Sequence, residues 1–226
     1  MWLSNSSIGR KVVMSVTGAM LILFLLFHGA MNLVVIFSPE TYNAICGFLG
    51  ANWYAVVASL GLALLAVIHI IYAFMLSVQN YRARGKDRYA VTARQEGVDW
   101  ASKNMLVLGL IVVGFLLLHL YNFWFKMQFA ELTGMEIGAF SPVDGAAYVT
   151  ELFNCPVYCV LYLVWLAAIW MHLSHGVWSA FQSMGWNGNI WMPRLKVIGY
   201  IVATIAVLPF TLVVLYYLSL FTGYCN

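Results

Sequence analysis

The sequence predicts an all-α integral membrane bundle of five transmembrane helices, and three observations lead to this fold class. First, 63% of the 226 residues are hydrophobic and only 8% are charged, whereas a soluble domain carries about 25% charged residues. Second, the apolar residues form five runs, each reaching the roughly 20 residues that a helix needs to cross a bilayer. Third, no run alternates between apolar and polar residues as a membrane β-strand does. Backbone groups must be paired in lipid, so each run is expected to be a helix.

The five predicted helices form a single membrane domain, residues 1–226. Their expected bounds are about 12–37, 53–81, 103–125, 156–184 and 197–222. The first run is too long for a secretory signal peptide and lacks a small-residue cleavage site, so it is expected to remain as a helix. Between the long helices we expect short helices near 89–96 and 146–153, and a short loop over 38–52.

The basic residues predict how the chain lies in the membrane. Ten of the eleven Lys and Arg residues precede the first predicted helix, lie between the second and third, or precede the fifth, and only Lys126 lies on the other side. Such an excess marks the cytoplasmic side of a membrane protein. The N-terminus is therefore expected in the cytoplasm and the C-terminus outside. The net charge of +3 is explained by this arrangement and does not indicate a nucleic-acid partner.

All four cysteines fall on or near the predicted outer face: Cys46, Cys155, Cys159 and Cys225. No C-x-x-C-H motif is present, so covalent c-type haem is excluded. A disulfide, for instance between Cys46 and Cys155, is compatible with an oxidising compartment. Buried or free thiols are the favoured interpretation.

Histidine supplies nearly all of the ionisable chemistry inside the predicted helices. The chain has five histidines, all within predicted spans: His28, His69, His119, His172 and His175. No Asp, Glu, Lys or Arg lies in the middle of any span. Ionisable groups within a membrane are costly, so they are functional candidates by default.

Helical rise predicts that four of these histidines pair by depth. His28 and His119 each come sixteen residues after the inner start of a helix, which places them roughly 24 Å from the inner face, in the outer half. His69 and His172 each come sixteen residues after the outer start of a helix. They are therefore expected level with each other in the inner half.

Two pairs at two depths predict two bis-histidine haem sites stacked across the bilayer. A single membrane histidine more often forms a hydrogen bond between helices, but four helices matched in depth, without buried acids, favour haem. Haem iron with two imidazole ligands has no open position, which suits electron transfer. Zinc or copper is a weaker alternative, since such sites usually take a compact cluster of ligands. Gly29 and Gly176 are candidates for the close approach of a flat macrocycle.

His175 is a second candidate on the fourth helix, because it lies three residues from His172 on the same helix face. Depth favours His172 as the iron ligand. His175 is then an alternative ligand, a partner of a haem propionate or of a quinone, or a packing residue.

With its histidines placed, the chain resembles a known family along nearly its whole length. It is similar to the cytochrome b membrane anchor of succinate dehydrogenase and fumarate reductase, in the single-chain, five-helix, dihaem form. The motifs that carry the resemblance, in order, are N-S-S-I-G-R-K at Asn5–Lys11, F-H-G-A-M-N at Phe27–Asn32, Y-N-A at Tyr42–Ala44, I-H-I-I-Y-A at Ile68–Ala73, H-L-Y-N-F-W at His119–Trp124 and H-L-S-H-G-V-W-S at His172–Ser179. Their order and spacing together are specific, although no single motif is.

The resemblance implies two haem b groups and their ligands. His28 and His119 would bind the outer, distal haem, and His69 and His172 the inner, proximal haem. In the family the ligand on the fourth helix stands four residues before a glycine, which here selects His172 before Gly176.

The resemblance also implies partners and a location. A flavoprotein subunit with FAD and an iron–sulfur subunit would dock on the cytoplasmic face, in a bacterial inner (cytoplasmic) membrane. The chain would pass electrons between the iron–sulfur subunit and a membrane quinone, with menaquinone expected. It would react with quinone without catalysing the dicarboxylate chemistry. Both a monomer and a dimer of this heterotrimer fit the sequence.

Two other functions are weighed against this one. A dihaem anchor of another respiratory enzyme, such as nitrate reductase, draws its ligands from two helices, whereas here four helices each carry one. A haem-free transporter that uses histidines for proton relay predicts buried acids or broken helices at mid-membrane.

The chain departs from the family at the end of the first outer loop. Some dihaem members carry an acidic residue there that helps to handle quinol protons. The corresponding stretch, Cys46–Gly50, has no acid, and Glu40 is the nearest substitute.

Overall fold

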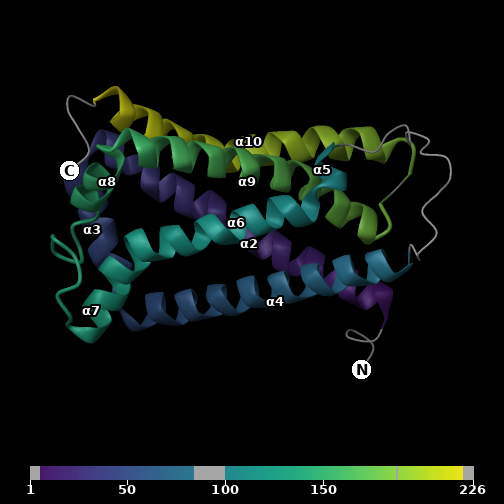
Figure 1. Ribbon diagram of the computed structural model, residues 1–226, viewed down its shortest axis with the longest axis horizontal. Coiled ribbons are helices and arrows are strands. Elements are labelled where there is room, and N and C mark those ends of the chain that lie inside the picture. Colours follow the sequence, from purple (N-terminus) through teal and green to yellow (C-terminus); the bar gives the residue numbers. More distant parts are fainter. Residues whose placement is uncertain (1–5, 84–99, 187, 221–226) are drawn as a thin grey trace.

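Five long apolar helices run the length of the molecule. The computed structural model describes residues 6–83, 100–186 and 188–220. The long helices are α2 (Ser7–Phe37), α4 (Trp53–Ala83), the continuous stretch Met105–Thr133, α9 (Pro156–Ser183) and α10 (Trp191–Ser219) (Figure 1). Each is long and apolar enough to cross a membrane. The predicted all-α, five-helix, multi-pass architecture is therefore confirmed.

The third span consists of three consecutive helical segments. These are α6 (Met105–His119), the π-helix η1 (Leu120–Phe129) and α7 (Ala130–Thr133). The span therefore extends beyond the expected end at residue 125. A ten-residue π-helix is unusual, since π geometry normally occurs as a single turn and often beside functional sites. Here it begins directly after His119.

Short helices cover one end of the bundle. These are α3 (Pro39–Phe48), α7 and α8 (Gly145–Phe153), whereas α5 (Trp100–Lys103) lies at the opposite end (Figure 1). Helix α8 agrees with the helix expected near 146–153, and the helix expected near 89–96 lies outside the described residues. The expectation of a loop over 38–52 is wrong. The Ser38 hydroxyl caps α3 by accepting the Thr41 backbone N–H at 3.2 Å, and Pro39 begins the helix, where its missing N–H has no cost.

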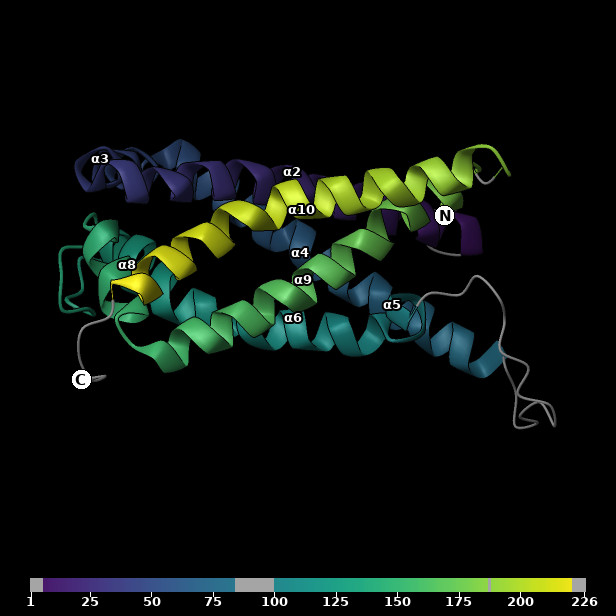
Figure 2. The same cartoon turned by 90° about the horizontal axis from the view of Figure 1, so that it is seen from above.

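Helices α9 and α10 lie against each other over much of their length (Figure 2). At Gly199 of α10 an added Cβ would come within 2.8 Å of the Ser174 carbonyl oxygen of α9. Ala203 and Ala206, further along α10, are fully buried. Small residues let membrane helices approach closely and gain dispersion energy, so this pair forms the most tightly packed part of the bundle.

Large apolar side chains cover the outside of the long helices. Examples that are more than half exposed are Leu23, Leu60, Leu110, Val160 and Ile205. They come from all five spans, and so much apolar surface is typical of a face that meets lipid or a partner.

The described basic residues collect at one end of the bundle. They are Arg10 and Lys11 at the start of α2, Arg82 at the end of α4, Lys103 in α5, and Arg194 and Lys196 at the start of α10 (Figures 1 and 2). Lys126 lies at the other end, with its Nζ 3.9 Å from a carboxylate oxygen of Glu151. The charge asymmetry is thus a property of the folded chain. Which compartment each end faces stays a prediction.

Helices α3 and α8 are joined by side-chain hydrogen bonds. The Asn43 amide donates to Asp144 Oδ1 at 2.7 Å, and its carbonyl oxygen accepts the Ala146 backbone N–H at 2.9 Å. Asp144 also caps α8 by accepting the N–H of Ala147 at 3.1 Å. These contacts hold the α3–α8 end together as one unit.

The cysteines of this end differ in state. Cys155 is disulfide-bonded, whereas Cys46 and Cys159 are free thiols. A pairing of Cys46 with Cys155 is therefore wrong. The favoured expectation of a free thiol holds for Cys46 and Cys159 but not for Cys155.

Candidate functional site

The structure brings four histidines together as two pairs, each formed across two helices. The ring centroids of His28 on α2 and His119 on α6 are 5.9 Å apart, with an angle of 81° between the ring planes. Those of His69 on α4 and His172 on α9 are 6.4 Å apart, at 67°. These are the two combinations that the depth estimate expects, and four different helices supply them.

The separation within each pair suits two imidazoles on one metal ion. A bond between a metal ion and an imidazole nitrogen is about 2 Å long, so two opposed imidazoles place their ring centroids roughly 6 Å apart. Within the described residues, no three His, Cys, Asp or Glu side chains are grouped so that they could hold a metal ion. A zinc site takes three or four protein ligands. A site with only two histidine ligands suits haem, because the macrocycle supplies the other four ligands of the iron.

Aromatic side chains surround the pair of His28 and His119, which we call the outer pair after its expected depth, as we call His69 and His172 the inner pair. Phe24 stacks on His28 with centroids 5.1 Å apart, and Phe210 of α10 lies 5.5 Å from the same ring. Phe123 and Trp165 lie 5.1 and 5.5 Å from the His119 ring. The surroundings are therefore flat and apolar, which suits the faces and edges of a macrocycle.

Several buried polar atoms near the pairs have no hydrogen-bond partner among the residues that the structure describes. They are Nδ1 of His119, Nδ1 of His172 and the indole Nε1 of Trp165. An unsatisfied buried donor or acceptor costs about 1–3 kcal/mol, and such groups in a native fold call for a specific explanation. An imidazole that binds iron through one ring nitrogen keeps a proton on the other, so the fit to haem rests on the two imidazoles that each pair offers and not on these Nδ1 atoms. The residues present therefore fit that group.

Two residues of the family-like motifs meet beside the outer pair. The Tyr42 hydroxyl of α3 donates to Asn32 Oδ1 at 3.1 Å, which turns the amide nitrogen toward His28. That nitrogen lies 3.3 Å from His28 Nδ1 and donates to the His28 carbonyl oxygen at 2.8 Å. Asn32 thereby links the α3 end of the bundle to His28.

Different glycines from those expected adjoin the histidine rings. An added Cβ at Gly29 would meet Phe210 at 3.1 Å, so Gly29 serves the packing of α2 on α10, and Gly176 has no atom that a Cβ would meet within 4 Å. At Gly18 a Cβ would lie 3.3 Å from His69 Cε1, and at Gly109 it would lie 3.9 Å from His172 Cε1. The close approach at the inner pair is made by these two glycines.

His175 belongs to neither ring pair. Its ring packs edge-on against Trp178, one helical turn away, with centroids 4.5 Å apart. The ring that contacts His69 is that of His172. This geometry favours His172 as the ligand on α9, and His175 stays the alternative.

An acid does reach the end of the segment between α2 and α4, but from another part of the chain. The Glu131 carboxylate of α7 accepts the Ala51 backbone N–H at 3.1 Å. Gln128 donates to the Gly50 carbonyl oxygen at 2.9 Å. Glu40 is exposed and accepts a hydrogen bond from the Ser38 hydroxyl at 3.3 Å. Glu131, rather than Glu40, is therefore the acidic group at this position.

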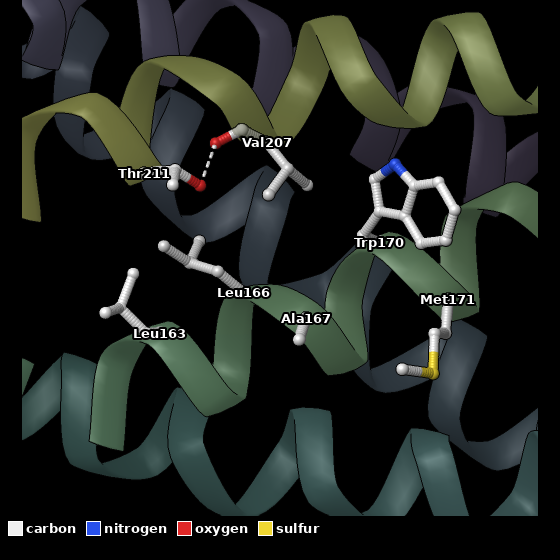
Figure 3. A pocket seen from close by; sticks show the side chains of 7 residues that line it. All are labelled: Leu163, Leu166, Ala167, Trp170, Met171, Val207 and Thr211. Atoms are coloured by element: carbon white, nitrogen blue, oxygen red, sulfur yellow. Dashed lines mark hydrogen bonds between the residues drawn. The ribbon is translucent and has the colours of Figure 1, made fainter. Parts of the chain in front are cut away.

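A separate apolar cavity of about 300 Å³ lies between α9 and α10 (Figure 3). The lining residues are Leu163, Leu166, Ala167, Trp170, Met171, Val207 and Thr211. Its polar groups are already engaged, because Thr211 donates to the Val207 carbonyl oxygen at 3.2 Å and the Trp170 indole donates to Thr204 at 3.0 Å. The cavity suits a hydrocarbon chain and offers no free donor to a quinone carbonyl.

Sequence reasoning missed Thr17, which lies beside the inner pair. Its Oγ1 is 3.1 Å from Nδ1 of His69. The sequence did carry a signal here, because Thr17 is followed by Gly18 within an apolar run. Threonine forms polar contacts between membrane helices, and glycine allows them to approach closely. Trp165 gave no such signal, since the His119 ring that it contacts comes from a distant part of the chain.

Comparison with protein-family models, with curated proteins and with solved structures found no match for this chain.

Proposed function

We propose that this chain is the dihaem cytochrome b membrane anchor of a succinate:quinone or quinol:fumarate oxidoreductase. The observation that carries the proposal is the pairing of four histidines from four membrane helices, with ring centroids 5.9 and 6.4 Å apart. His28 and His119 would hold the outer haem b, and His69 and His172 the inner one. Bis-histidine haem takes up and releases single electrons without binding oxygen.

The protein's own contribution is to hold the two sites at different depths in one bundle. The paired ligands come from separate helices, so the positions of the sites depend on helix packing. The family resemblance supplies the remaining parts of the proposal. These are a flavoprotein and an iron–sulfur subunit on the cytoplasmic side of a bacterial inner membrane, and menaquinone as the quinone.

The haem-free transporter is less well supported. Among the described residues, the acids all lie toward the α3–α8 end, and Glu131, at the end of its helix, is the only acid within a span. A proton relay at mid-membrane would have to run through histidines alone. A nitrate-reductase type of anchor is disfavoured because each of four helices contributes one ring to the pairs.

The test is haem quantitation on the complex purified from its membrane. We expect about two b haems per chain in the wild type by reduced-minus-oxidised spectra and the pyridine haemochrome assay. His172→Ala should lose one haem, and His175→Ala, the matched control three residues away, should keep both. Retention of the helical far-UV circular dichroism spectrum shows that each variant is folded.

The possible results separate the parts of the proposal. Folded wild-type protein without haem would overturn the electron-transfer function. Loss of haem in His175→Ala but not in His172→Ala would move one ligand and leave the function. Two haems without succinate-dependent quinone reduction, in a preparation that contains flavoprotein and iron–sulfur subunits, would favour another respiratory enzyme.

A further inference from the structure

Thr17 of α2 makes the one side-chain hydrogen bond that the described structure shows to a ring of the inner histidine pair. Its Oγ1 lies 3.1 Å from Nδ1 of His69, 52 residues away on α4. Thr17 is 5% exposed, so water does not compete strongly for this contact. The neighbouring Gly18 lets α2 come close to the same ring, since a Cβ there would lie 3.3 Å from His69 Cε1.

The direction of this hydrogen bond follows from the other bonds of the hydroxyl group. A threonine hydroxyl has one proton to donate and two lone pairs that accept. The Thr17 proton is used within α2, where Oγ1 lies 2.9 Å from the Val13 carbonyl oxygen and 3.1 Å from that of Met14. Toward His69 the oxygen is left as an acceptor, so Nδ1 of His69 carries the proton.

A proton on Nδ1 decides the chemistry of the other ring nitrogen. In a neutral imidazole only one nitrogen is protonated, so Nε2 of His69 keeps its lone pair. A metal-bound histidine usually donates its other N–H to a nearby acceptor, which fixes the tautomer and raises the basicity of the ligand. Thr17 supplies that acceptor here.

We propose that Thr17 is a positioning residue that holds His69 in the tautomer able to bind iron and that lowers the reduction potential of the inner haem. The proposal rests on the proposed function, because it takes His69 as an iron ligand. A more basic ligand stabilises the oxidised iron, and hydrogen bonding near the iron is one of the means by which a protein sets the potential.

Of the four paired histidines, only His69 has a hydroxyl oxygen beside its Nδ1 among the described residues. Nδ1 of His172 and Nδ1 of His119 are buried and have no hydrogen-bond partner in the described part of the chain. Beside His28 the neighbouring group is the Asn32 amide nitrogen, which is a donor, at 3.3 Å from Nδ1. Removing the Thr17 hydroxyl should therefore change one haem and leave the other as it was.

The experiment compares Thr17→Val, Thr17→Ser and a matched control, Thr211→Val, in the purified complex. Valine keeps the shape of threonine without the acceptor, and serine keeps the acceptor. Thr211 is also a helix threonine, and it donates to the Val207 carbonyl oxygen one turn back (Figure 3). Among the described residues it makes no hydrogen bond to a histidine ring. The readouts are haem content, the midpoint potential of each haem by spectroelectrochemical titration, and the low-spin EPR spectrum.

We expect Thr17→Val to raise the potential of one haem and to leave the other unchanged. A tenfold shift of the reduction equilibrium corresponds to about 59 mV for a one-electron couple, and we expect a shift of up to that order. Thr17→Ser should restore the wild-type potential, and Thr211→Val should not change it. If Thr17→Val loses one haem, retention of that haem in Thr17→Ser and Thr211→Val supports the same role.

Two results would overturn the proposal. One is Thr17→Val with two haems whose potentials and EPR signals equal those of the wild type. The other is a change in Thr17→Ser as large as that in Thr17→Val, which would assign the effect to packing. A wild-type complex without haem is a different failure, because it removes the proposed function itself.

Discussion

The ring planes of His28 and His119 stand at 81° to each other, close to perpendicular, and those of His69 and His172 stand at 67°. Each angle compares two rings on separate helices, so it depends on helix packing. If each pair held one haem iron as proposed, imidazoles at such angles would interact about equally with the two iron d orbitals of π symmetry. Those orbitals would then stay close in energy.

This geometry predicts the EPR spectrum of the oxidised protein. We expect both low-spin haems to give strongly anisotropic signals with a large highest g value. The measurement is a low-temperature EPR spectrum of the purified complex. Two rhombic signals typical of parallel imidazole planes would show that the rings turn away from the described angles when haem is bound.

Tyr42 is expected to influence the outer haem through Asn32. In Tyr42→Phe the hydroxyl that holds Asn32 Oδ1 at 3.1 Å is lost, and a hydrogen bond of this kind contributes roughly 1 kcal/mol. The Asn32 amide should then turn more freely beside His28. We expect an altered signal from one haem with little loss of haem.

The matched control is Tyr54→Phe, whose hydroxyl donates to the Phe48 carbonyl oxygen at 2.6 Å, away from the histidines. The measurement is the haem absorbance and EPR spectrum of both variants. An equal change in the two variants would mean that Tyr42 has no special connection to the outer pair.

The five spans could be predicted because lipid leaves the backbone few choices, so composition and run length decide the result. The pairing of His28 with His119 and of His69 with His172 could also be expected, because helical rise converts sequence position into depth. Rotation about the helix axes and the register between helices are set by packing. The sequence therefore could not give the ring angles or the contact of Thr17 with His69.

Two local features were missed for different reasons. The sequence carries a start signal for helix α3, since Ser38 followed by Pro39 is a typical cap and first residue. A segment so short between two spans nevertheless favours a loop. The π-helix η1 had no sequence signal that we can name. A π-helix has more residues per turn than an α-helix, so it rotates the side chains that follow His119. The position of Asn122, which is buried and donates to Tyr162 at 3.2 Å, depends on this rotation.

Gly18 is expected to be sensitive to substitution because of the His69 ring. In Gly18→Ala the new methyl group would lie 3.3 Å from His69 Cε1, closer than comfortable contact, so the ring or α2 must shift. We expect a changed signal or a partial loss of the inner haem. Gly61→Ala is the control, because it lies on α4 with nothing within 4 Å of the added atom. Haem quantitation checks both, and equal haem loss in the two would contradict the special role of Gly18.

Gly199 is expected to control the stability of the α9–α10 pair. A Cβ in Gly199→Ala would lie 2.8 Å from the Ser174 carbonyl oxygen, so the two helices must separate slightly. Overpacking of this kind typically costs about 1–3 kcal/mol. We expect a lower thermal midpoint in detergent, measured by tryptophan fluorescence. Gly114→Ala is the control, because its added Cβ meets nothing within 4 Å, and it should leave the thermal midpoint unchanged. An equal fall of the midpoint in both variants would mean that replacing a helix glycine lowers stability without any effect of the α9–α10 contact.

Cys46 is expected to be a slowly reacting thiol at neutral pH. Burial in the α3–α8 end is the main cause that raises the pKa of Cys46 to about 11, whereas its hydrogen bonding with Tyr42 and the Gly145 backbone acts in the opposite direction. The thiolate is the reactive form, so at pH 8 only about one thiol in a thousand is reactive.

The pH dependence of alkylation measures this pKa. The rate at Cys46, taken as the difference between the wild type and Cys46→Ala, should rise about tenfold per pH unit from pH 8 and level off only near pH 11. An exposed thiol would level off about two units lower. A plateau near pH 9 would show that Cys46 is more open to water than its packing against Gly145 and Tyr42 indicates.

The same pKa shift links Cys46 to the stability of the α3–α8 end. Between about pH 9 and pH 11 the unfolded chain releases the Cys46 proton, whereas the folded chain keeps it. The folded state then binds more protons, so the free energy of unfolding falls as the pH rises through this window. Cys46→Ala should remove this part of the alkaline destabilisation, and denaturant unfolding at pH 8 and pH 10.5 measures it. If the free energy of unfolding depends on pH identically in wild type and variant, its fall at alkaline pH comes from other groups. Tyr42 is one such group, because burial also raises its pKa.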